Sequence, residues 1–127
     1  MARKPTAAEL EILNVLWRLE SATVRDVHTE LHRTNQAIGY TTVLKLMQIM
    51  TEKRLVERDE RDRAHVYRPA LKREETQGQM VRDLLDRAFS GSAAQLVLRA
   101  LSDRRASKQE IAEIRQLLDG MEKEEKR

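Results

Sequence analysis

The stretch from Gly39 to Lys53 constrains the fold more than any other part of this chain. Its apolar residues recur at the spacing of an α-helix, so that one face can be buried: Val43, Leu46, Met47 and Met50. The opposite face carries mainly hydroxyl, amine and amide groups: Thr41, Lys45, Gln48 and Glu52. The pattern predicts a helix over residues 40–53 with one face in a core and the other open to a partner. An ordinary surface helix would show the same pattern, so the neighbouring segments must distinguish the two.

Two further helices are predicted before this stretch. Thr6-Ala7-Ala8-Glu9 matches a capping box, in which the threonine hydroxyl and the glutamate carboxylate each bind the other residue's backbone amide. The helix that begins there should run to about Leu19. Thr23 and Asp26 repeat the signal and start a shorter helix, and Gly39 stands where the third helix would be capped. The predicted order is therefore helix, helix, turn, helix.

The pattern changes after Arg54 from helical spacing to short strands. Residues 55–58 and 64–68 are predicted to pair as a β-hairpin around a charged loop, with Pro69 limiting the second strand. Three helices followed by a hairpin form the winged-helix arrangement, a variant of the helix-turn-helix. In that arrangement the third helix enters the major groove of DNA, and the hairpin loop reaches the flanking backbone.

The hairpin loop carries two arginines, Arg61 and Arg63, at the place where phosphate contacts would be made. Acidic residues are interleaved with them and would weaken a purely electrostatic contact: Asp59, Glu60 and Asp62. A solvated hairpin tip without a partner is the alternative interpretation of this loop.

Beyond Lys72 the chain shows no strand signals, and three more helices are predicted. The first contains a broad apolar stripe over residues 80–89 and is interrupted at Gly91. The second, over residues 93–101, is apolar almost all round. The third begins at a capping box over residues 107–110 and has one apolar face, before a charged tail over 122–127 that should fray.

The predicted domains are therefore a winged helix over residues 1–70 and a helical region over residues 71–127. The second is too short to form a stable independent core from three helices with wide apolar stripes. Pairing with a second copy would cover those stripes, whereas folding back on the first domain is the alternative. The residues predicted to form the dimer interface are Leu84, Leu85, Phe89, Leu96, Val97, Leu98, Leu101, Ile114 and Leu118.

Composition excludes several classes of function. No cysteine occurs among the 127 residues, which excludes disulfides, thiolate catalysis and a cysteine-built metal site. No apolar run approaches membrane-spanning length and the first residues contain no apolar signal region, so a cytoplasmic location without membrane insertion is expected. The net charge of +3 is too small to indicate nucleic-acid binding by itself. Nucleic-acid binding must instead be inferred from the positions of the basic residues.

No catalytic, metal or cofactor site is predicted. His28 and His32 are four residues apart, but Glu30 does not directly follow the first histidine and no third ligand is apparent. No nucleophile-and-base arrangement and no Gly-rich phosphate loop occurs in the sequence. An enzyme is therefore not expected.

Four segments together resemble a known family: TAAELEILNVLW (6–17), ATVRDVH (22–28), GYTTV (39–43) and RAHVYRP (63–69). They are similar to the penicillinase-repressor family, of the BlaI/MecI/CopY type, and the resemblance extends from about Thr6 to Met121. It implies a homodimeric transcriptional repressor with an N-terminal winged helix and a C-terminal dimerisation region. It also implies that the double-stranded DNA operator is pseudo-palindromic, with inverted TACA/TGTA-like half-sites.

By position, the resemblance makes Thr41, Thr42 and Lys45 part of the reading turn of the recognition helix, and it places Arg61 and Arg63 in the wing. The complete set of predicted DNA-binding residues is Tyr40, Thr41, Thr42, Lys45, Gln48, Arg61 and Arg63. The alternative is a winged helix used for protein–protein contact without DNA binding, which the same fold permits.

Two departures from the family pattern concern release from DNA. In members that respond to β-lactams, a membrane sensor-linked protease cuts an Asn-Phe bond after Leu-Val-Leu. Here residues 96–98 are Leu-Val-Leu but Arg99-Ala100 follows, so this dipeptide is only a candidate cleavage region and the sensor-protease only a candidate partner. Copper-responsive members bind metal through C-terminal cysteines, which this chain lacks. Loss of dimerisation, by proteolysis or another signal, is the predicted route of release.

Overall fold

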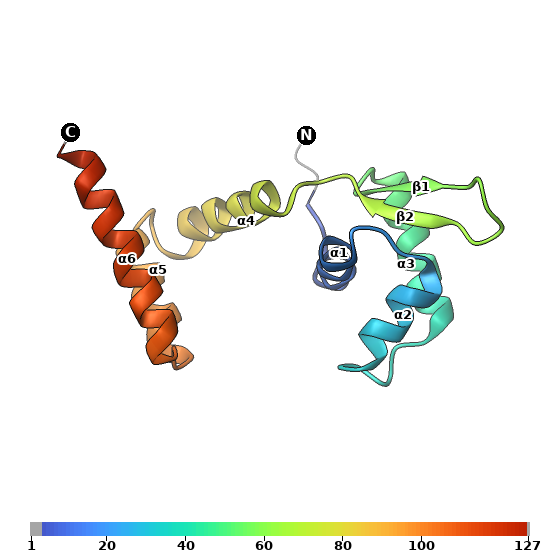
Figure 1. Ribbon diagram of the computed structural model, residues 1–127, viewed down its shortest axis with the longest axis horizontal. Helices are drawn as coiled ribbons and strands as arrows, with labels where there is room; N and C mark the ends of the chain where they lie inside the picture. Colours follow the sequence, from blue (N-terminus) through green and yellow to red (C-terminus); the bar gives the residue numbers. More distant parts are fainter. Residues whose placement is uncertain (1–3, 127) are drawn as a thin grey trace. The chain divides into compact units, whose positions relative to one another are not determined.

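The computed structural model describes residues 4–126 and confirms a mainly helical chain with one small β-hairpin (Figure 1). Its contacts divide it into two compact units, one ending at Gly78 and the other beginning at Gln79. The first unit contains α1 (Ala7–Leu19), α2 (Val24–His32), α3 (Tyr40–Glu52), β1 (Val56–Asp59) and β2 (Val66–Pro69). The helix α4 (Arg73–Ala88) runs through the division, and α5 (Ala93–Asp103) and α6 (Lys108–Glu125) follow.

The first two helices begin at the predicted capping boxes. The Glu9 amide donates to the Thr6 hydroxyl at 3.2 Å, and the Thr6 amide donates to the Glu9 carboxylate at 2.9 Å. Thr23 and Asp26 exchange the same pair of hydrogen bonds, both at 3.1 Å. Helix α3 follows the extended residue Gly39, which has no side chain to cap it. Local hydrogen bonding therefore determines where α1 and α2 start.

The hairpin pairs β1 and β2 in antiparallel register, from Val56 opposite Pro69 to Asp59 opposite Val66. Both strands lie one or two residues later than predicted. Pro69 is accepted at the end of β2 because both strands of a two-stranded sheet are edge strands. Tyr67 also exchanges two backbone hydrogen bonds with Ala22, at 2.8 and 3.0 Å, which connects the hairpin to the segment between α1 and α2.

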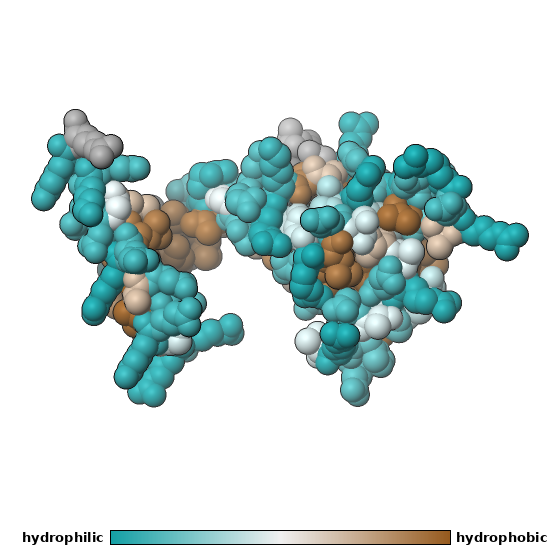
Figure 2. Space-filling view, viewed as in Figure 1, coloured by the Kyte–Doolittle hydropathy of each residue, from teal (hydrophilic) through white to brown (hydrophobic). Residues whose placement is uncertain are grey.

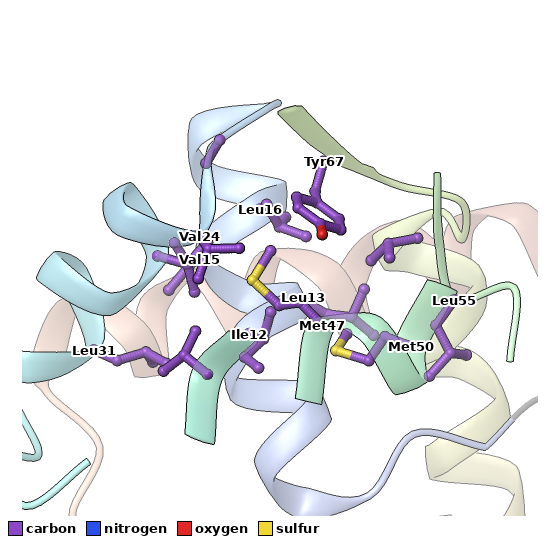
Figure 3. Close-up of a cluster of buried hydrophobic side chains, with 14 residues drawn as sticks. Ile12, Leu13, Val15, Leu16, Val24, Leu31, Met47, Met50, Leu55 and Tyr67 are labelled. Carbon is purple, nitrogen blue, oxygen red and sulfur yellow. The ribbon is translucent and has the colours of Figure 1, made fainter. Parts of the chain in front are cut away.

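The core of the first unit combines side chains from α1, α2, α3 and the hairpin (Figure 3). The largest fully buried members are Tyr67, Ile12, Leu13, Leu16, Met47, Met50 and Leu55. Because α3 contributes only its inner face to this cluster, its other face is turned away from the core.

Glu9 is buried even though it carries a charge, with only 2% of its side chain exposed. The Lys53 ammonium donates to both carboxylate oxygens at 3.0 Å, which links the start of α1 to the end of α3. Burial acts to raise the pKa of Glu9, but the Thr6 amide and the Lys53 ammonium together outweigh it, so this pKa is lowered. The sequence pattern predicted Glu9 only as a capping residue.

The first unit extends further than the predicted boundary after Ala70. The indole Nε1 of Trp17 donates to the Leu71 carbonyl at 2.9 Å, and Leu71 packs against the core. Thr76 is buried, and its hydroxyl donates to the Lys72 carbonyl at 3.0 Å. These contacts assign the first turns of α4 to the winged unit, and the contacts divide the chain after Gly78.

The second unit lacks a buried core. Among residues 79–126 no side chain is fully buried, and large apolar side chains on all three helices are 38–60% exposed. Apolar surface is visible among the charged side chains of this unit in Figure 2. No helix within residues 4–126 has both the length and the apolar character needed to cross a membrane.

Helix α6 extends into the charged end of the chain. We expected residues 122–127 to fray, but α6 continues through Glu125, and the Lys126 amide donates to the Glu122 carbonyl at 3.3 Å. Residues 1–3 and 127 lie outside the described part of the chain.

Replacing Lys53 by Met should lower the free energy of unfolding by about 1–3 kcal/mol, because the buried Glu9 carboxylate loses its counterion. Lys45→Met is the matched control, since Lys45 lies on the exposed face of the same helix. The folded-state pKa of Glu9 is lowered, so its contribution is present above the unfolded pKa and is lost as pH falls through the folded pKa. Urea titrations should therefore show the Lys53→Met deficit at pH 7 and a smaller deficit at pH 3. Equal stability of both variants at pH 7 would contradict the proposed role of the pair.

Candidate nucleic-acid interface

The outer face of α3 is available for contact with a partner. Burial of Val43, Met47 and Met50 turns the opposite side of the helix towards solvent. Four of the predicted DNA-binding residues lie exposed on that side: Thr41, Thr42, Lys45 and Gln48. Leu46, predicted to be part of the buried stripe, is only partly buried and packs at the edge of the core.

This face has few negative charges and few internal partners. The first turn of α3 contains no acidic residue, and the first carboxylate along the helix is that of Glu52, at its end. Within the described part of the chain, no hydrogen bond or ion pair engages the side chains of Thr41, Thr42, Lys45 or Gln48. Their hydroxyl, amine and amide groups are therefore free to bind an external ligand.

Tyr40 differs from the other predicted residues of α3 because its ring has a partner in α2. Tyr40 is 44% exposed, and its ring meets that of His28 edge-on, with 5.8 Å between ring centroids. The His28 Nε2 atom lies 3.2 Å from the Ile38 carbonyl oxygen, in the turn between α2 and α3. Tyr40 and His28 thus help to orient the start of α3. Within residues 4–126 no group of three potential ligands is arranged to hold a metal ion.

Arg61, at the tip of the wing, is paired with Asp59. Its guanidinium donates to both carboxylate oxygens of Asp59 at 2.6–3.0 Å, and its backbone amide donates to Oδ1 at 3.0 Å. Mainly because of the guanidinium hydrogen bonds, the pKa of Asp59 is lowered to about 2. The carboxylate therefore remains charged at neutral pH and competes with any phosphate for Arg61.

Arg63 has a different environment from Arg61. It is exposed, and no ion pair among the described residues involves it. It lines a surface groove of about 420 Å³ between the wing and the start of α3, where Tyr40 also lies. Arg25, in the first turn of α2, lines the same groove and was not among the predicted residues. Its position two residues after the helix cap Thr23, in the first helix of a helix-turn-helix, could have indicated it, because that helix crosses the DNA backbone.

The predicted dimer-interface residues fall into two groups. Leu84, Val97, Leu98 and Leu118 are exposed in the single chain. The others are half-buried among the three helices: Leu85, Phe89, Leu96, Leu101 and Ile114. Leu117 and Met121 lie on the apolar face that the spacing predicted for the last helix, but they were not included among the predicted interface residues. They are 60% and 56% exposed, so they extend the exposed apolar surface of α6.

The candidate cleavage region lies within a helix. Arg99 and Ala100 are exposed, but both belong to α5, which continues to Asp103. The helical backbone at this dipeptide is hydrogen-bonded and would have to open locally before a protease could bind it in an extended form.

Comparisons with known proteins agree with this architecture. The sequence profile of the penicillinase repressor family matches residues 5–120. The transcriptional regulator BlaI of Mycobacterium tuberculosis is 35% identical over 101 residues, which cover 77% of this chain and 72% of that protein. The penicillinase repressor of Bacillus licheniformis is 27% identical over 88% of this chain and 87% of its own length. That of Staphylococcus aureus is 20% identical over 91% of both chains.

A solved structure shares part of this fold. The solution structure of the DNA-binding domain of the repressor BlaI matches with a TM-score of 0.52 and 23% identity, over 59% of this chain and 90% of that domain. The relatives bear the names of transcriptional regulators and repressors, not of enzymes. The family profile covers both the winged unit and most of the helical region that follows it. This chain therefore belongs to the penicillinase repressor family.

Proposed function

We propose that this chain represses transcription as a homodimer that binds a pseudo-palindromic operator in double-stranded DNA through α3 and the β-wing. The observation that carries the proposal is the outer face of α3. It presents exposed hydroxyl, amine and amide groups without internal partners among the described residues, and no carboxylate precedes Glu52 on the helix. Such groups suit hydrogen bonding to base edges and phosphates in the major groove.

In this proposal Thr41, Thr42, Lys45 and Gln48 contact bases or adjacent phosphates, and Tyr40 lies at the start of the same helix. The wing contacts the flanking backbone. We assign the larger share of that contact to Arg63, because Arg61 is already hydrogen-bonded to Asp59. Repression is steric, since a dimer bound across a promoter would exclude polymerase from it.

Dimerisation is proposed to occur through α4, α5 and α6. Their apolar side chains remain largely exposed in a single chain, and a second copy would remove that surface from water. A two-fold dimer would present two α3 helices to half-sites about 34 Å apart, one turn of DNA. Loosening these helices would release the DNA by removing the linkage between half-sites, without a change in the reading face. Cleavage near Arg99-Ala100 by a membrane sensor-protease is one such route.

Lys45→Ala should weaken binding to a duplex with inverted TACA/TGTA half-sites. If Lys45 contacts a phosphate, the slope of log K against log salt should become shallower by about 0.9 per subunit. Weaker binding with an unchanged slope would assign Lys45 to base reading. Fluorescence anisotropy across a salt series measures both, with Lys108→Ala in α6 as the control. Equal binding by Lys45→Ala and the unaltered protein would contradict the proposed role of α3, and failure of the unaltered protein to bind at low salt would overturn the function.

Asp59→Asn should tighten DNA binding several-fold, because it removes a negative charge and frees the Arg61 guanidinium for a phosphate. Asp62→Asn is the matched control, since it removes one charge from the same loop without releasing Arg61. The salt slope should become steeper for Asp59→Asn by up to about 0.9 per subunit. No change in either variant would indicate that the wing lies away from the DNA.

Leu98→Asp should make the protein monomeric and weaken binding to the full operator by at least about tenfold, because the linkage between half-sites is lost. Leu98 is 53% exposed in the single chain, so the substitution should not unfold it. Leu19→Asp, at an exposed leucine of the first unit, is the control and should remain dimeric. Sedimentation velocity gives the assembly state. A dimeric Leu98→Asp protein would exclude α5 from the interface.

A further inference from the structure

The groove beside the start of α3 is formed by three segments that are distant in the sequence. Residues 23–25 come from the start of α2, Tyr40 and Leu44 from α3, residues 63–65 from the end of the wing loop, and Tyr67 from β2. The floor is apolar, with Val24, Leu44 and the buried Tyr67. The rim is polar and exposed, with Arg25, Tyr40, Arg63 and His65. The groove therefore adjoins the proposed reading face but is built mainly by other residues.

The charged residues that line this groove are all basic. None of its lining residues is acidic, whereas a comparable groove between α1 and α2 is lined by both Glu11 and Glu30. The guanidinium groups of Arg25 and Arg63 take part in no ion pair within residues 4–126. The nearest carboxylate in sequence to Arg25, that of Asp26, accepts a hydrogen bond from the Thr23 amide at the helix cap. Two free guanidinium groups thus face one depression without a neutralising partner.

We propose that Arg25 and Arg63 bind the same phosphate of the DNA backbone, one from α2 and the other from the wing. This inference rests on the proposed function and adds Arg25 as a binding residue. Guanidinium groups donate paired hydrogen bonds to phosphate oxygens, and a single phosphodiester has two unesterified oxygens that can each accept from a different arginine. The phosphate would be held beside the start of α3, so its position would determine how α3 is aligned in the major groove.

The proposal distinguishes Arg63 from Arg61, two residues away. Arg61 is turned back onto Asp59, whereas Arg63 lines the groove. It also assigns the start of α2 to the contact with the backbone, in agreement with the general geometry of the helix-turn-helix.

The test compares Arg25→Gln, Arg63→Gln and the double variant on the inverted-repeat duplex. Each single variant should bind at least about fivefold more weakly, since each loses a charge-assisted hydrogen bond. If both arginines neutralise one phosphate per subunit, the double variant should lose about 1.8 from the salt slope per dimer, not the roughly 3.6 expected for separate phosphates. Arg33→Gln, at the other end of α2, is the matched control and should bind as the unaltered protein does.

A chemical probe locates the phosphate directly. Methylphosphonate substitution at single backbone positions removes one charge at a time. One position per half-site should weaken binding of the unaltered protein but have little effect on the Arg25→Gln/Arg63→Gln protein. If Arg25→Gln and Arg63→Gln lose the effect of methylphosphonate at different backbone positions, the two arginines bind different phosphates and the shared contact is overturned.

Two further outcomes separate this inference from its alternatives. If the unaltered protein binds DNA and Lys45→Ala weakens it, but Arg25→Gln is neutral, the inference fails and the proposed function stands. If the unaltered protein does not bind the duplex, both fail. Inorganic phosphate should displace the duplex from the protein no better than chloride does at equal ionic strength. Phosphate-specific competition that Arg25→Gln abolishes would assign the groove to free phosphate and overturn the inference.

Discussion

Burial of the inner face of α3 is the constraint on which the rest of this structure depends. Val43, Met47 and Met50 are completely removed from solvent against α1, α2 and the hairpin. Successive side chains of a helix are about 100° apart around its axis, so burial of one face also determines which side chains point outward. Lys53, at the end of the helix, is paired with the buried Glu9 of α1, which restrains α3 in rotation as well as in position. The proposed reading face is therefore a consequence of packing.

The distribution of charge matters more here than its total. A net charge of +3 would not distinguish this chain from many proteins that bind no nucleic acid. In the structure, several carboxylates have partners within the chain: Glu9 with Lys53, Asp26 with a helix cap and Asp59 with Arg61. The cations that remain without partners among the described residues include Lys45, Arg25 and Arg63, on α3 and beside it. Pairing within the chain thus leaves a basic surface on a chain of small net charge.

The two units differ in whether they form a buried apolar core. The winged unit has a buried core, whereas the helices of the second unit bury no side chain fully within residues 79–126. A unit of this size without a core of its own gains stability when its apolar faces are covered by another surface. This physical requirement connects folding with the proposed assembly. In that proposal, a signal that disturbs α5 or α6 weakens DNA binding without changing α3.

The sequence alone determined the local features, namely the type of each element, the start of each capped helix and the exposed face of α3. Capping boxes join residues three apart, and helical periodicity repeats within a few turns. Both can therefore be predicted from the sequence without knowledge of tertiary contacts. Only the tertiary structure decided that Glu9 is buried beside Lys53, that the winged unit extends to Gly78, and that Arg25 lies in one groove with Arg63. Those facts depend on how α1, α2, α3, the hairpin and the start of α4 pack against one another, and residues separated by tens of positions carry no local signal of that proximity.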